Sequence, residues 1–151
     1  MSRDLDHVFT FYVQCTPAPL WNALLDPDVT PHWAHGLRVL TEGRPGDAIH
    51  WVRPDDPEGR AVMTGEILER EDQRSLLHSF RLNTHDDPET RVRFRIDPEG
   101  DVCRLVVTHV GFDDRNDSWH ETLAGWPRAL SALKTWLETG EELGRREAAA
   151  D

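Results

Sequence analysis

Two histidines, His78 and His109, are the residues best suited to chemistry, and each lies in a stretch rich in β-forming residues. Side chains alternate between the two faces of a strand, and the apolar neighbours predict that both imidazoles point inward. A buried imidazole can anchor a ligand or act as a general acid or base. His109 is the stronger catalytic candidate, because its T-H-x-G-F motif ends a strand just before a helix. The alternative, which we favour, is a core histidine hydrogen-bonded to a neighbour.

A second pair, His32 and His35, has H-x-x-H spacing after a short predicted helix. Catalytic zinc normally uses three protein ligands, and no companion motif supplies a third. We therefore expect a surface pair beside Trp33 and no metal site. No serine or cysteine carries a nucleophile signature, and neither a phosphate loop nor a dinucleotide fingerprint is present, so we expect no cofactor.

The chain contains six tryptophans. Trp21 is predicted to be core and Trp136 to lie at the edge of a helix stripe, whereas the others could line a pocket. Aromatic stripes belong to a core more often than to a ligand site, and here we weigh the two interpretations equally. The predicted ligand-binding residues are Trp33, Trp51, Met63, Ile67, His78, Phe80, Phe94, Val107, His109, Trp119, Leu123, Trp126 and Leu130.

Composition limits the kinds of protein this can be. The chain has 151 residues, of which 38% are hydrophobic and 30% charged, which suits one domain with a modest core. A net charge of -11 argues against nucleic-acid binding. We expect a cytoplasmic protein, because no apolar run is long enough for a membrane span, no signal peptide is seen, and Cys15 and Cys103 stand apart as in a reducing compartment.

The element that must position these residues is a long C-terminal helix, predicted over 118–139. Its start has the capping-box spacing of Ser118 and Glu121, and Gly140 suits its end. Pro127 should kink it. The apolar face recurs at steps of three and four and comprises Trp119, Leu123, Trp126, Leu130, Leu133 and Leu137.

The remaining elements are predicted to form a sheet. A strand over 8–15 precedes a helix over 17–25, capped by Thr16, and a shorter helix that ends near Trp33. Short loops predict antiparallel neighbours. The further strands are expected at 37–40, 48–53, 60–70, 75–82, 90–97 and 102–112.

Strand register can be predicted from the side-chain pattern. Pairing Asp97 with Val102 places Ile96, Phe94 and Val92 opposite Cys103, Leu105 and Val107 on one face. It leaves Arg91, Arg93 and Arg95 on the solvated face. In the same way, Glu69 is expected opposite Leu76 and Ile67 opposite His78.

One curved sheet packed against one helix is predicted, with a cavity between them. This order of elements resembles the helix-grip fold of the START and birch-pollen-allergen (SRPBCC) superfamily. More narrowly, it resembles the bacterial single-domain homologues of the Hsp-ninety ATPase activator. The matching stretches are TPAPLWNALLDPDVTPHW at 16–33, GEILERED at 65–72, LLHSF at 76–80, LVVTHVGF at 105–112 and HETLAGWPRALSALKTWLE at 120–138.

The resemblance implies an α+β fold, with a curved antiparallel sheet wrapped around the long C-terminal helix and two short helices after the first strand. It implies one domain over 1–151, with an ordered core at about 8–140, and a ligand cavity. It does not imply a particular ligand or reaction. Two departures are Pro127, where a helix former would be usual, and the absence of room for the additional domain of the eukaryotic activators.

Three functions remain open at this point. The first is a binding protein for a small apolar or aromatic ligand. The second is a cyclase- or hydrolase-type enzyme that uses His109 or His78 as acid and base. The third is a stress-related, co-chaperone-like interaction module. We expect a monomer or a homodimer, since Leu68 and Leu77 on the outer face could form a dimer patch or simply be exposed.

Overall fold

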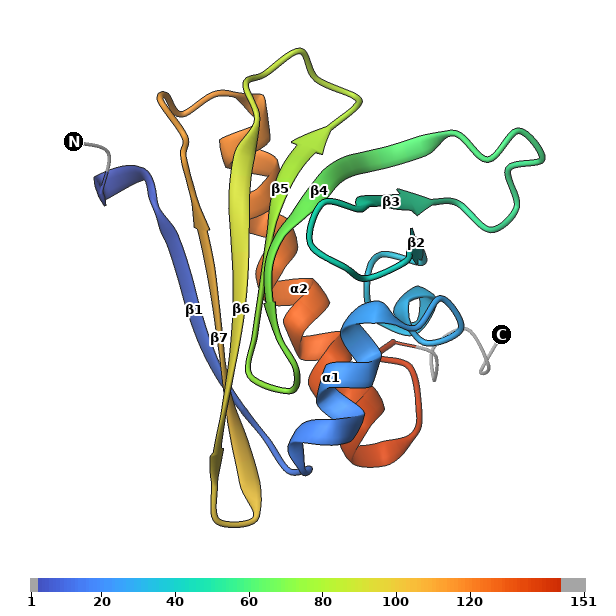
Figure 1. The fold of residues 1–151 in the computed structure, drawn as a ribbon, viewed down its shortest axis with the longest axis vertical. Coiled ribbons are helices and arrows are strands. Elements are labelled where there is room, and N and C mark those ends of the chain that lie inside the picture. The colour runs from blue at the N-terminus through green and yellow to red at the C-terminus, as the bar shows by residue number, and fades with distance from the viewer. Residues whose placement is uncertain (1–2, 145–151) are drawn as a thin grey trace.

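The computed structural model describes residues 3–144, which form one antiparallel sheet, a long helix and a short helix (Figure 1). The sheet has seven strands in the order β1-β7-β6-β5-β4-β3-β2. The elements are η1 (Arg3–Leu5), β1 (His7–Val13), α1 (Pro17–Leu25), η2 (Thr30–His32), β2 (Arg38–Thr41), β3 (Ala48–Val52), β4 (Ala61–Glu71), β5 (Ser75–Leu82), β6 (Thr90–Glu99), β7 (Val102–Val110) and α2 (Asp117–Thr139).

The α+β helix-grip prediction is confirmed. Figure 1 shows α2 crossing one face of the sheet, with α1 beside the C-terminal half of α2. Both helices contribute side chains to the same core. The first strand, β1, pairs with the last strand, β7. Leu20, Trp21 and Leu24 of α1 are buried, and the burial of Trp21 agrees with its prediction as a core residue.

The predicted register between β6 and β7 is wrong by two residues. Val102 pairs with Glu99 rather than with Asp97, and Ile96 lies opposite Leu105. The turn is tighter than expected, because Gly100 adopts a left-handed φ of +66° that a short hairpin loop requires. A shift of two residues keeps every side chain on its predicted face, so the buried set is unchanged.

An irregular stretch of β4 lies beside β5. Ile67 pairs with His78 as predicted, but Glu69 pairs with Leu77 rather than with Leu76, because the register shifts between Ile67 and Glu69. Just before it, a Cβ at Gly65 would overlap the Ser79 carbonyl group. Only glycine therefore allows the two backbones to approach this closely.

The start of α2 differs from the prediction. Its N-cap is Asn116, whose side chain accepts a hydrogen bond from the Trp119 amide at 2.8 Å. Ser118 and Glu121 do not form a capping box, because both side chains bind the loop between β5 and β6 instead. The helix continues through Pro127 and ends at Gly140, which adopts the predicted left-handed conformation.

The buried stripe of α2 also differs from the apolar pattern. Its buried residues include Thr122, Ala129, Leu130 and Leu133, whereas Leu123 is 40% exposed. Trp126, which belongs to the predicted apolar face, is only partly buried. The apolar pattern misplaced the stripe because it left out the polar Thr122. This residue can be buried because its hydroxyl donates to the Ser118 carbonyl at 2.8 Å.

We predict that Leu133→Ala lowers the free energy of unfolding by about 2–5 kcal/mol, because Leu133 is completely buried between α2 and the sheet. The matched control is Leu123→Ala on the exposed side of the same helix, which should change it by less than about 0.5 kcal/mol. Chemical denaturation measures both. Equal losses for the two variants would contradict the observed orientation of α2.

Candidate ligand-binding cavity

A cavity of about 370 Å³ lies between the sheet and the N-terminal half of α2. Its walls are mainly apolar, and it reaches the surface where the exposed residues His35, Arg53 and Glu121 line it. The lining residues are Trp33, Ala34, His35, Leu37, Trp51, Arg53, Val62, Met63, His78, Phe80, Leu82, Phe94, Glu121, Thr122, Gly125, Trp126 and Ala129.

Many of the predicted ligand-binding residues lie in this wall. They come from the loop after η2, from strands β3 to β6 and from α2, and they are Trp33, Trp51, Met63, His78, Phe80, Phe94 and Trp126. Four other predicted residues do not line the cavity and are packed in the core, namely Ile67, Val107, His109 and Leu130.

Two further predicted wall residues lie elsewhere. Leu123 is on the exposed side of α2. Trp119 is held beside β1, where its indole N–H donates to the Leu5 carbonyl at 2.8 Å and its ring lies 5.3 Å from that of His7. The helical pattern placed Trp119 and Leu123 on the same face as Trp126, but in the structure only Trp126 of the three lines the cavity.

His109, the preferred catalytic candidate of the sequence, is fully buried, and both of its ring nitrogens are bonded. Nδ1 accepts from the Trp126 indole N–H at 3.0 Å. The proton of the neutral ring is therefore on Nε2, which lies 2.7 Å from Oγ1 of Thr90. That hydroxyl in turn donates to the Phe80 carbonyl at 3.2 Å. His109 thus fits the core-histidine interpretation and supports the position of Trp126.

His78 is 1% exposed and stands in the cavity wall. Nδ1 lies 2.7 Å from the Ser79 carbonyl oxygen, whereas Nε2 has no hydrogen-bond partner among the described residues. Burial lowers the pKa of His78 to about 4. Burial, together with charge repulsion from His7 and His78, lowers the pKa of His109 to about 3. Both rings are neutral at pH 7.

Sequence reasoning missed the polar residues His35, Arg53 and Glu121 at the cavity mouth, and the buried Thr122 in the wall. The H-x-x-H pair is divided, since His32 stacks on Trp136 at 3.8 Å while His35 turns toward α2. His35 has a left-handed φ of 55°, and a Cβ at Gly125 would come within 3.4 Å of its Nε2. The sequence signal for this contact was Gly125, because a glycine inside a helix often marks a place where another part of the chain approaches the backbone closely.

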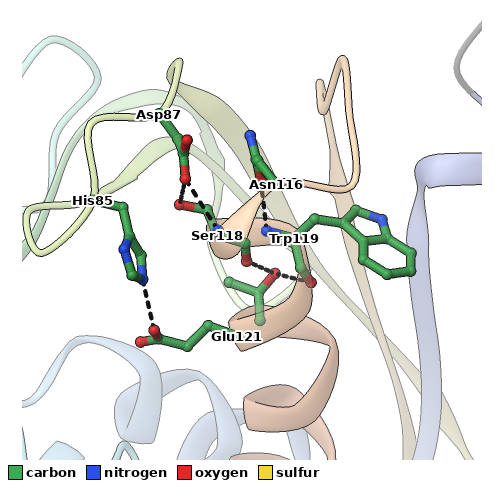
Figure 2. Close-up of polar contacts among 7 residues, drawn as sticks. His85, Asp87, Asn116, Ser118, Trp119 and Glu121 are labelled. Carbon is green, nitrogen blue, oxygen red and sulfur yellow. Dashed lines mark hydrogen bonds and ion pairs between the residues drawn. The ribbon is translucent and has the colours of Figure 1, made fainter.

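The loop between β5 and β6 is fixed to the start of α2 next to this mouth (Figure 2). The Ser118 hydroxyl donates to Asp87 at 2.7 Å, and so does the Ser118 amide at 3.1 Å. Nε2 of His85 lies 2.8 Å from a carboxylate oxygen of Glu121. Because of this contact, Glu121 raises the pKa of His85. One side of the cavity mouth is therefore held by a charge-dependent contact.

Within residues 3–144, no group of three or more His, Cys, Asp or Glu side chains could hold a metal ion. In the same part of the chain, no helix is long and apolar enough to cross a membrane.

We predict that acid destabilises the protein through His78 and His109. The unfolded chain takes up a proton at each histidine near the ordinary pKa of about 6.5, but the folded protein does so only at much lower pH. The contribution of the two neutral histidines to stability is therefore fully present above about pH 6.5 and is lost progressively as the pH falls below that value. Between pH 7 and pH 5 each histidine should cost roughly 2 kcal/mol of unfolding free energy. Denaturation of the wild type and of His78→Phe at several pH values isolates the contribution of His78. If the unfolding free energies of the two proteins had the same pH dependence, the prediction for His78 would be wrong.

We also predict that Glu121→Gln returns the pKa of His85 toward 6.5, because the carboxylate is the main cause of its increase. An NMR titration of the His85 ring measures this directly. Asp86→Asn is the control in the same loop, since Asp86 contacts Arg81 rather than His85. An unchanged pKa in Glu121→Gln would show that the contact does not exist in solution.

Solved structures of similar shape show the same fold. Protein MLL2253 from Mesorhizobium loti is 22% identical with a TM-score of 0.73, covering 87% of this chain and 96% of that chain. CalU16 from Micromonospora echinospora, in solution, is 22% identical with a TM-score of 0.74, over 92% and 68%. The Aha1 dimer from Colwellia psychrerythraea is 16% identical with a TM-score of 0.73, over 89% and 97%.

No curated protein matches the chain at the sequence level. Residues 14–138 match the family model described as activator of Hsp90 ATPase homolog 1-like protein. The match covers most of the chain, including α1, the whole sheet after β1 and nearly all of α2. The resemblance seen in the sequence motifs is thereby confirmed, and the chain belongs to the family of activator of Hsp90 ATPase homolog 1-like proteins.

Proposed function

We propose that this protein binds a small apolar or aromatic molecule in the cavity between the sheet and α2. The observation that carries the proposal is the cavity wall itself. Its volume of about 370 Å³ falls in the range of small-molecule sites. Five aromatic rings line it, from Trp33, Trp51, Phe80, Phe94 and Trp126.

The wall offers an apolar ligand few competing charges. The indole N–H groups of Trp33 and Trp126 are already bonded, to the Ala23 carbonyl at 2.9 Å and to His109. The charged side chains Arg53 and Glu121 are exposed at the mouth rather than deep in the wall. Burial of apolar ligand surface against these rings would supply the binding free energy, at about 25 cal/mol per Å².

Acid and base catalysis by the predicted histidines has less support. Such a reaction needs titratable groups that converge on one point with free donor or acceptor positions. His109 is outside the wall and uses both ring nitrogens. His78 alone, among the two candidates, has a free ring nitrogen. One neutral imidazole without a second group suits recognition of a ligand better than turnover.

We expect the uncharged fluorescent naphthalene prodan to bind the wild type saturably. Val62→Phe should weaken this binding by roughly tenfold or more, because Val62 lines the cavity and a larger side chain occupies its space. Val8→Phe is the control, since Val8 is 60% exposed on β1 and does not line the cavity. Absence of saturable binding to the wild type, or equal affinities of all three proteins, would refute the proposed site.

A further inference from the structure

The protonation of His78 can be deduced from its one hydrogen bond. Nδ1 lies 2.7 Å from the Ser79 carbonyl oxygen, which can only accept a hydrogen bond. Nδ1 therefore carries the proton. The ring is neutral, since burial lowers its pKa to about 4, so Nε2 carries a lone pair and can only accept.

The surroundings of His78 leave that lone pair without a donor. The nearest rings are those of Trp51, Phe94 and Phe80, whose centroids lie 5.1, 6.0 and 6.4 Å from the imidazole. The phenylalanines have no donor, and the Trp51 indole makes no hydrogen bond to Nε2. Among the described residues, two buried side-chain nitrogens have no hydrogen-bond partner, His78 Nε2 and Arg104 Nε, and of these two residues only His78 lines the cavity.

Three donors of the wall, on Thr122, Trp126 and Trp33, cannot turn toward Nε2 without losing a hydrogen bond. The Thr122 hydroxyl donates to the Ser118 carbonyl at 2.8 Å. The indole N–H of Trp126 donates to His109, and that of Trp33 to the Ala23 carbonyl. Burying a polar atom without a partner is unfavourable, so a donor brought by a ligand would gain more here than in water.

We infer that the ligand of this cavity carries one uncharged hydrogen-bond donor, a phenolic or alcoholic O–H on an apolar body, which donates to Nε2 of His78. This inference rests on the proposed function and adds the ligand class. A carboxylate does not qualify, because it is ionised at pH 7 and has only acceptors to offer a lone pair. An apolar ligand without a donor would fill the same space but leave Nε2 unpaired.

The test uses two probes that differ in the donor alone, 2-naphthol and its methyl ether 2-methoxynaphthalene. Calorimetry near pH 7, where the phenol keeps its proton, gives the affinity of each for the wild type and for His78→Phe. We expect the wild type to bind 2-naphthol roughly tenfold or more tightly than the ether. His78→Phe should bind both with similar affinity, because its ring fills the space without an acceptor.

A second readout uses the wild type only, so it does not depend on the folding of the variant. Saturation with 2-naphthol should move the nitrogen chemical shift of His78 Nε2, and saturation with the ether should leave it near its free value. Equal binding of both probes to the wild type with no shift at His78 overturns the donor inference and leaves the proposed cavity intact. Failure of both probes to bind overturns the cavity proposal and this inference together.

Discussion

The structure depends on how one face of α2 fills the concave side of the sheet. In its C-terminal half, Leu130 and Leu133 are 1% and 0% exposed and complete the core. Nearer its N-terminus, the residues of α2 that line the cavity include three small ones, Thr122, Gly125 and Ala129, beside the large Trp126. The sheet opposite them contributes the rings of Trp51, Phe80 and Phe94 to the cavity wall. Small side chains on α2 thus leave the cavity where larger ones would close it.

Several polar groups beside that cavity are joined by hydrogen bonds. Trp126, His109, Thr90 and the Phe80 carbonyl form one chain of bonds that ties α2 to three neighbouring strands. This chain fixes the Trp126 ring, which closes one side of the cavity, at the cost of using both nitrogens of His109. The histidine that stays available to a ligand is therefore His78. In the proposed function, His109 holds Trp126 in position and His78 recognises the ligand.

The fold was predictable because period-two and period-3.6 patterns survive errors in detail. The β6–β7 register was wrong by two residues, yet each side chain kept its face. The wall was less predictable. Trp33, Trp51, His78 and Trp126 could be named, but Leu123 was misplaced because two polar residues, Ser118 and Thr122, occupy the buried stripe. The bonding of His109 and the approach of His35 to Gly125 depend on contacts between distant segments, which no local pattern records.

The most direct test of the central claim follows the six indole N–H signals by NMR during titration with an aromatic ligand. Trp33, Trp51 and Trp126 line the cavity, whereas Trp21, Trp119 and Trp136 do not. If the ligand binds between the sheet and α2, the first three signals shift together and saturate at one equivalent, while the other three stay near their free positions. Uniform small shifts of all six, or saturating shifts confined to Trp21, Trp119 and Trp136, would contradict the account.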